Sequence, residues 1–116
     1  MEEFKPFTVE RPWGNFRQFT FNSLSTVKIL TLKPNESLSL QSHAKRSEFM
    51  KIIQGSGIVE VGDMKYDAKE GEEHNIPVDT KHRATAGSFG LTYLEISLGN
   101  FEENDEVRYE DKYGRA

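Results

Sequence analysis

The chain has 116 residues and a net charge of −4, and 35% of its residues are hydrophobic. One domain over residues 1–116 fits this length, and so mild a charge gives no electrostatic footprint for nucleic acid. The absence of cysteine excludes disulfides and thiolate metal sites. Because no stretch resembles a signal peptide or a membrane span, we expect a cytoplasmic protein without a membrane partner.

Predicted strands account for most of the chain. Stretches of β-favouring residues in near alternation, bounded by turn signals, occur at residues 16–21, 27–32, 38–43, 49–53, 58–61, 65–68, 81–85 and 91–98. Gly55-Ser56-Gly57 predicts a break between two of them, and no amphipathic helix of ten or more residues is apparent. Short strands at such intervals predict a sandwich or a barrel. We expect Trp13 to be buried in a docked N-terminal strand, and residues 101–116 to be either a solvated tail or a segment docked across the barrel.

Four side chains of types that bind metals are spaced so that they can meet. Gln41 and His43 are two residues apart, so on a strand both leave the same face. Glu48 joins them only if the polar residues 44–47 turn the chain, and His82 arrives from a separate strand. Two imidazole nitrogens, one carboxylate oxygen and one amide oxygen suit one divalent ion such as Mn, Fe, Co, Ni or Zn.

The alternative interpretation is that these four residues are exposed and unrelated, which is the usual situation for any one of them alone. Two of the three histidines in the chain belong to the set, however, and glycine and proline fall where such a site needs turns. We therefore interpret the four as one metal site. The third histidine, His74, has no evident ligand partner and is expected at the surface or half-buried.

The same landmarks resemble the two sequence motifs of the cupins. The places of the first motif, G-x5-H-x-H-x3,4-E-x6-G, are occupied here by Asn35, Gln41, His43, Glu48 and Gly55. The places of the second, G-x5-P-x-G-x2-H-x3-N, are occupied by Gly71, Pro77, Asp79, His82 and Ala86. The spacing is kept throughout, although several residues differ from the motif. The resemblance implies an all-β double-stranded β-helix, the cupin jelly-roll barrel.

A narrower resemblance is to the type II phosphomannose isomerases. The stretches that carry it are RPWG at 11–14, LSLQSH at 38–43, RSE at 46–48, IP at 76–77, TKHR at 80–83 and VRYEDKYGR at 107–115. In that family the cupin commonly forms the C-terminal part of a bifunctional enzyme that also carries a mannose-1-phosphate guanylyltransferase domain. Because 116 residues leave no room for that domain, the resemblance implies the isomerase cupin standing alone. Family members often have further histidines where this chain has Ala44 and Lys45, and a tryptophan where it has Met50.

The resemblance implies a metal-dependent isomerase that interconverts mannose 6-phosphate and fructose 6-phosphate, with Zn, Mn, Co or Ni bound. In the family, the arginine at the place of Arg46 is implicated in the reaction. We expect its guanidinium at the rim of the metal pocket, either binding a phosphate or enediolate or pairing with an acid across the turn. Glu95 either faces solvent or points into the barrel as a proton-transfer group.

Two other functions stay open at this point. One is a non-catalytic cupin that binds a sugar or small metabolite, and the other is a metal-dependent dioxygenase, because a fold alone does not fix a function. Uncovered edge strands favour pairing with another chain, so we also expect a homodimer.

Overall fold

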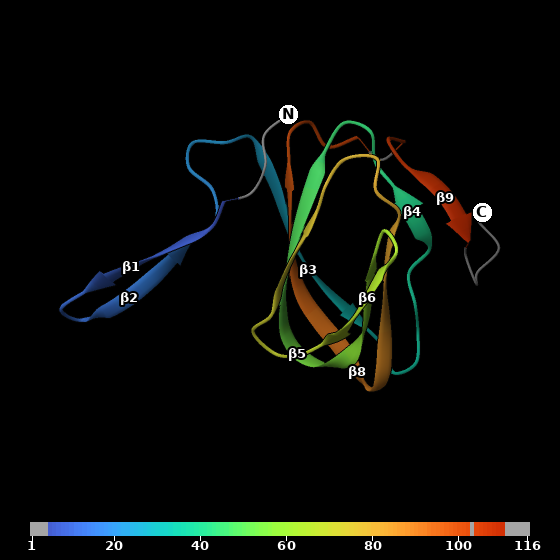
Figure 1. The fold of residues 1–116 in the computed structure, drawn as a ribbon, viewed down its shortest axis with the longest axis horizontal. Coiled ribbons are helices and arrows are strands. Elements are labelled where there is room, and N and C mark those ends of the chain that lie inside the picture. The colour runs from blue at the N-terminus through green and yellow to red at the C-terminus, as the bar shows by residue number, and fades with distance from the viewer. Residues whose placement is uncertain (1–4, 103, 111–116) are drawn as a thin grey trace.

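The computed structural model describes residues 5–102 and 104–110, and every regular element in them is a strand (Figure 1). The strands are β1 (Phe7–Arg11), β2 (Gly14–Gln18), β3 (Ser25–Leu32), β4 (Leu40–Ser42), β5 (Ser47–Val61), β6 (Met64–Ala68), β7 (Glu73–Ile76), β8 (His82–Leu98) and β9 (Val107–Glu110). Within these residues there is no helix long and apolar enough to cross a membrane. The all-β prediction is therefore confirmed.

Two long strands, β5 and β8, form the frame of the barrel. They pair antiparallel from Ser47↔Leu98 to Val61↔His82. Strands β3 and β4 pair with β8, β6 and β7 pair with β5, and β9 pairs with β4. Both long strands bend at the lower end of Figure 1, so their halves contribute to different walls around the core.

The predicted break at residues 55–57 is wrong, because β5 continues through it with shifts in register on either side of Gly55. Gly55 has φ +96°, and a Cβ at this position would collide with the carbonyl group of Gly90 on β8. Glycine here allows two backbones to approach at a β-bulge. The signal that suggested a break marks the bend of a continuous strand.

The core lies inside the barrel, with a second cluster on its outer face. The inner cluster contains Leu32, Met50, Ile52, Val59, Ala68, Ile76, Ala84, Ala86, Leu91 and Tyr93. The outer cluster contains Phe49, Ile96 and Leu98, and the Phe19 ring packs on it with its centroid 5.2 Å from that of Phe49. The segment after β2 therefore covers part of the outer face.

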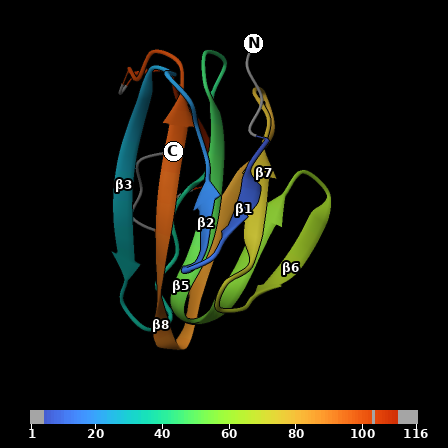
Figure 2. The same cartoon turned by 90° about the vertical axis from the view of Figure 1, so that its left-hand side faces the viewer.

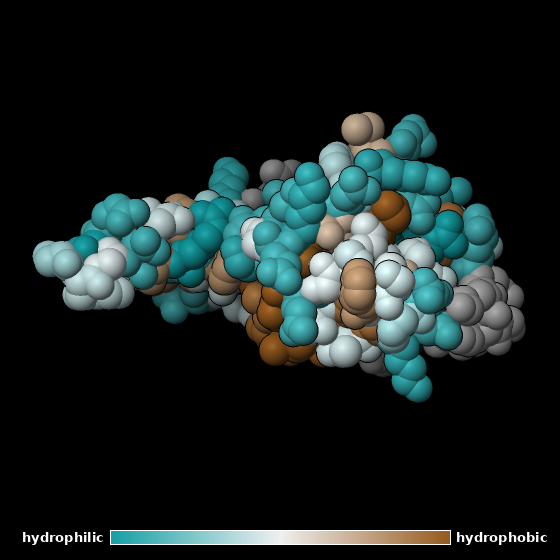
Figure 3. All heavy atoms as spheres, turned by 90° about the horizontal axis from the view of Figure 1, so that it is seen from below, coloured by the Kyte–Doolittle hydropathy of each residue, from teal (hydrophilic) through white to brown (hydrophobic). Residues whose placement is uncertain are grey.

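The β1–β2 hairpin projects away from the barrel (Figures 1 and 2). Trp13 lies in its turn and is 73% exposed, so the expected burial of this indole is wrong. None of the described residues forms a second layer over this turn, which leaves the ring in solvent. Figure 3 shows apolar surface gathered on the barrel beside the base of the hairpin.

The segment after β8 returns across the barrel. Residues 99–102 and 104–110, here called the C-terminal strap, lead into β9, which pairs with β4 through Leu40↔Glu110 and Ser42↔Val107. Of the two expectations for this part of the chain, docking across the barrel is confirmed for residues 107–110. Residues 111–116 lie outside the described residues.

Candidate metal centre

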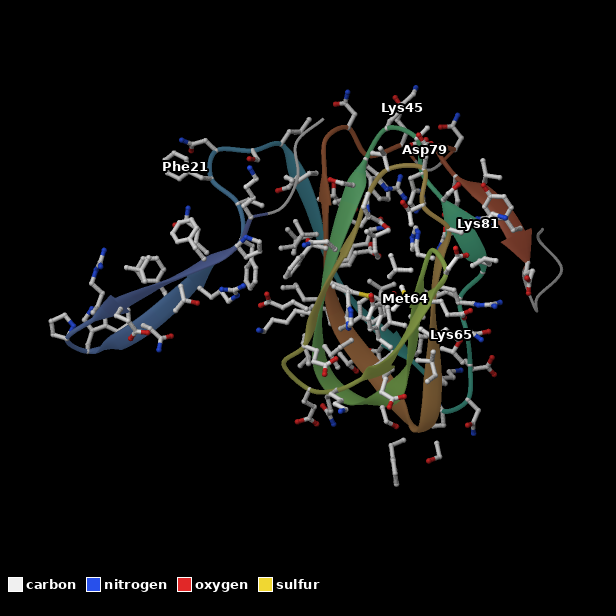
Figure 4. All side chains as sticks on the ribbon, in the orientation of Figure 1. Phe21, Lys45, Met64, Lys65, Asp79 and Lys81 are labelled. Carbon is white, nitrogen blue, oxygen red and sulfur yellow. The ribbon has the colours of Figure 1, made fainter. Side chains whose placement is uncertain are left out.

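Strand pairing brings the predicted metal ligands to one end of the barrel. Gln41 on β4 pairs with His82 at the start of β8. His43 follows β4 directly, and after the turn at residues 44–46 the chain enters β5, where Glu48 is the second residue. Figure 4 shows Lys45, Asp79 and Lys81 at this end, where the turn meets the loop before β8. A backbone hydrogen bond joins the loop before β8 to the end of β4: the N–H of Asp79 donates to the carbonyl of His43 at 2.7 Å.

The side chains of His43, Glu48 and His82 converge, and all three residues are buried. Oε1 of Glu48 lies 3.0 Å from Nε2 of His82 and 3.5 Å from Nε2 of His43. The two imidazole centroids are 5.1 Å apart. One potential ligand atom from each residue lies within 4.8 Å of the others, as a shared metal ion requires.

Hydrogen bonds fix which imidazole nitrogens face this centre. Nδ1 of His43 donates to the carbonyl oxygen of Asp105 at 2.7 Å, and Nδ1 of His82 donates to that of Thr80 at 2.9 Å. Since a carbonyl oxygen only accepts, each Nδ1 carries the hydrogen. Each neutral ring then directs the lone pair of Nε2 at the centre, which is the usual arrangement for a metal-binding histidine.

Three buried polar atoms lack hydrogen-bond partners among the described residues. Two of them belong to predicted ligands, Oε1 of Gln41 and Nε2 of His82, and the third is Nε2 of His74, away from the centre. Glu48 is close to Nε2 of His82, but not in the geometry of a hydrogen bond. Unpaired buried polar atoms are costly, and a cation between the Gln41 and His82 atoms would satisfy both. The donor set of two nitrogens and two oxygens therefore fits a borderline divalent metal.

The electrostatics of the centre favour an ionised carboxylate. Burial raises the pKa of Glu48, but the nearby His82, His43 and Arg46 outweigh burial and hold this pKa at about 2. Burial also lowers the pKa of His43, despite the opposing charge of Glu48, and so favours its neutral form. Both effects favour the forms of Glu48 and His43 that bind metals. Burial lowers the pKa of His82, but the adjacent Glu48 carboxylate outweighs burial and raises this pKa.

The guanidinium of Arg46 was expected at the rim of the metal pocket, but the structure places it inside the metal centre. Its side chain is 5% exposed, and Nε lies 3.3 Å from Oε2 of Glu48. Nη1 donates to the carbonyl of Glu102 at 3.0 Å, Nη2 donates to Nε2 of His43 at 3.3 Å, and the guanidinium stacks 4.3 Å from the centre of the Phe101 ring. The turn folds its guanidinium inward because acceptors and an aromatic face lie there. The salt bridge across the turn exists, although it is a buried one.

Glu95 faces a small cavity beside the centre. The cavity has a volume of ≈ 20 Å³, room for about one water molecule, and Gln41, His82 and Tyr93 also line it. Burial raises the pKa of Glu95, and the negative charge of Glu48 raises it further, to about 7. Of the two expected orientations, the structure has the inward one.

The C-terminal strap supplies contacts that the sequence did not indicate. Asp105 binds the ligand-bearing turn, accepting from the backbone N–H groups of Ala44 at 3.0 Å and Lys45 at 2.9 Å. The sequence also did not indicate a contact from β8, outside the strap, where Ser97 donates to Oε2 of Glu48 at 3.2 Å. The acidic composition of residues 102–106 indicated that this segment could accept hydrogen bonds, but it did not show which residue faces the turn.

Comparisons with known proteins decide the family. Residues 2–111 match the family model described as mannose-6-phosphate isomerase C-terminal. The chain belongs to this family. The narrower resemblance drawn from the sequence is thereby confirmed.

Curated members of the mannose-6-phosphate isomerase C-terminal family are much longer than this chain. A mannose-1-phosphate guanylyltransferase of Salmonella montevideo is 37% identical over 110 residues, which are 92% of this chain and 23% of that protein. The alginate biosynthesis protein AlgA of Pseudomonas aeruginosa is 34% identical over 110 residues, which are 93% and 23% of the two chains. The chain spans about a quarter of the length of these relatives.

Solved structures confirm the cupin fold of this family member. Oxalate decarboxylase of Bacillus subtilis superposes with a TM-score of 0.68 at 26% identity, over 74% of this chain and 24% of the enzyme. A cupin protein of Bacteroides fragilis superposes with a TM-score of 0.60 at 21% identity, over 77% and 80% of the two chains. Mn(II) centres have been described in the oxalate decarboxylase.

Proposed function

We propose that this chain is a metal-dependent isomerase that interconverts mannose 6-phosphate and fructose 6-phosphate. The observation that carries the proposal is the position of Glu95, whose carboxyl group lines the same cavity as the predicted metal ligands Gln41 and His82. A proton-transfer group next to a metal centre is what aldose–ketose isomerisation needs. The family match supports the same reaction.

The metal would be held by Gln41, His43, Glu48 and His82. When bound, it supplies positive charge that stabilises the sugar oxygen that becomes negative during the reaction, an effect of several kcal/mol in comparable enzymes. The enclosed position of these residues limits water around the reacting atoms.

Glu95 performs the proton transfer in this proposal. Its carboxylate removes the proton from C2 of the aldose, which leaves a cis-enediolate, and the resulting carboxylic acid returns a proton to C1. The hydrogen of the C2 hydroxyl moves to the oxygen on C1, so that the ketose has the same atoms as the aldose. A carboxyl with a pKa of about 7 exists in both forms near neutral pH, which suits a group that must take and return a proton.

The phosphate of the substrate needs a cation at the mouth of the barrel. The guanidinium of Arg46 directs all three of its nitrogens at protein acceptors. Lys28 of β3, in contrast, is exposed, and its Nζ lies 4.1 Å from the centre of the Phe101 ring. Lys28 pairs across the strands with Glu95. Because the cavity holds only about one water molecule, we infer that the C1–C2 end enters and the phosphate stays outside, near Lys28.

A coupled assay of the metal-loaded protein with each sugar phosphate tests the function. Turnover is expected with at least one of Co, Mn, Mg and Zn, and Glu95→Gln should abolish most of it while metal content is unchanged. Absence of turnover with all four metals, together with saturable binding of the sugar phosphate, would replace the isomerase by a binding protein.

The phosphate contact has its own test. Lys28→Gln should raise KM for mannose 6-phosphate with a smaller effect on kcat. Lys33→Gln is the matched control, because Lys33 is also exposed and directly follows β3. Equal KM values for the two variants would exclude Lys28 as the phosphate contact.

A further inference from the structure

The C-terminal strap binds the turn that connects two predicted metal ligands, and one of its residues makes three of these contacts. The carboxylate of Asp105 accepts from the N–H of Ala44 through Oδ1 at 3.0 Å and from the N–H of Lys45 through Oδ2 at 2.9 Å. Its carbonyl oxygen accepts from Nδ1 of His43 at 2.7 Å. Three consecutive residues, 43–45, are therefore held by a residue 60 to 62 positions away in sequence.

The two backbone contacts have the form of an anion bound by successive N–H groups. Such groups in a turn form a concave site that attracts negative charge, and charge-assisted hydrogen bonds of this kind are stronger than neutral ones. These contacts lower the pKa of Asp105, although partial burial opposes them. The side chains of Ala44 and Lys45 are exposed, so apolar packing does not hold the turn in place.

The third contact sets the chemistry of His43. With its hydrogen on Nδ1, this ring presents the lone pair of Nε2 to Glu48 and His82. The opposite tautomer would place a hydrogen on Nε2, which then could not bind a metal. It would also face a nitrogen of Arg46 that can only donate.

We propose that Asp105 is a positioning residue of the metal centre, whose carboxylate holds the turn so that its own carbonyl keeps His43 in the metal-binding tautomer. This inference rests on the metal centre proposed above, but not on the sugar substrate. Partners of this kind orient metal-binding histidines, and their loss typically weakens metal affinity about 10- to 100-fold.

The test compares three full-length variants. Asp105→Ala removes both contacts to the turn, and Asp105→Asn keeps one acceptor oxygen while its amide group opposes the second N–H. Tyr109→Phe is the control: it removes another strap contact, the hydrogen bond of 2.9 Å between its hydroxyl and Ser42, and leaves the turn untouched. Affinity for Co²⁺ and Zn²⁺ is measured by titration, and melting temperature monitors folding.

The tautomer is read from the ring nitrogens of His43 by NMR of the metal-free protein. The parent and Tyr109→Phe should show hydrogen on Nδ1 alone, whereas Asp105→Ala should show a mixture of tautomers. Metal affinity should fall about 10- to 100-fold in Asp105→Ala, less in Asp105→Asn, and hardly at all in Tyr109→Phe.

The outcomes separate this inference from the proposed function. If Asp105→Ala keeps both the tautomer and the affinity of the parent, Asp105 does not position His43. If Tyr109→Phe loses as much affinity as Asp105→Ala, the strap acts only as a general support, and the inference is also wrong. If the parent binds no metal, the proposed centre fails, while the tautomer comparison still decides the role of Asp105. Should Asp105→Ala not fold, Asp105→Asn provides both measurements.

Discussion

Nε of Arg46 lies 3.3 Å from Oε2 of Glu48, and both side chains are at most 5% exposed. A buried charge depends on its partner, because removing one member of such a pair leaves the other uncompensated. The same guanidinium donates to the His43 nitrogen that a metal would use. Arg46 therefore stabilises the metal-free centre and also opposes a second positive charge within it.

We expect Arg46→Ala to lower the free energy of unfolding of the metal-free protein by about 3–5 kcal/mol. Chemical denaturation measures this change. Lys45→Ala is the matched control, because the ion pair of Lys45 with Glu102 is exposed and should contribute about 1 kcal/mol or less. Equal decreases in the free energy of unfolding of the two variants would show that the buried Arg46 pair stabilises the protein no more than the exposed Lys45 pair.

Arg46→Gln should increase affinity for Zn²⁺, since it removes a cation and frees the lone pair of Nε2 on His43. Zinc titration against a competing chelator measures the affinity. Weaker binding in this variant would instead mean that Arg46 is needed to hold Glu48 in place.

The double change His43→Ala with His82→Ala should remove the bound metal, because imidazoles are the stronger ligands of the predicted set. Elemental analysis of the metal-loaded protein measures the content. His74→Ala is the control: His74 lies on β7 beside Tyr66, 5.1 Å between ring centroids, and not among the converging ligands. Unaltered metal in the double variant would place the site elsewhere.

Glu95 should make the metal-free protein less stable as pH rises. Burial raises the pKa of this carboxyl from 4.5 to about 7, so between these values the folded chain retains a proton that the unfolded chain has lost. The free energy of unfolding then decreases with pH across this window, and the contribution of the protonated carboxyl is fully lost above it. Denaturation of the parent and of Glu95→Gln at several pH values should show this decrease in the parent and a flatter profile in the variant. Parallel profiles would contradict the raised pKa.

We propose that the chain forms a homodimer through the β1–β2 hairpin. Phe7, Val9 and Phe16 share one face of it, given the pairing Val9↔Phe16, and an isolated two-stranded hairpin is marginal in water. Val27 and Ile29 of β3 are also exposed, by 58% and 65%, and could receive that face from a second copy.

Light scattering at micromolar concentration should give twice the mass of the chain, and Phe16→Lys should give the monomer mass. Met64→Lys is the control, because Met64 is 56% exposed on β6, away from the hairpin. A monomeric parent would overturn the proposal.

Local patterns in the sequence predicted most of the strands and the convergence of His43, Glu48 and His82, because alternation and motif spacing are local properties. The orientation of Glu95 was not decided by alternation, because both faces of β8 carry apolar residues, Leu91 and Tyr93 on the inner face and Ile96 and Leu98 on the outer one. The burial of Arg46 depends on Phe101 and on the carbonyl of Glu102, which the chain brings to the turn from more than 50 residues away. A contact made by a backbone carbonyl, as between Asp105 and His43, leaves no mark in residue types.

The long pairing of β5 with β8 has a consequence for the order in which the protein assembles. Every pair in it is separated in sequence by β6 and β7, and the closest pair along the chain is Val61↔His82. Because loop closure costs more entropy as the loop lengthens, pairing that starts there proceeds towards Ser47↔Leu98, so Glu48 meets Ser97 near the end. Non-local pairing of this kind also makes folding slow. A newly synthesised chain would thus acquire its complete ligand set only in the last steps of folding, and metal uptake would follow folding instead of nucleating it.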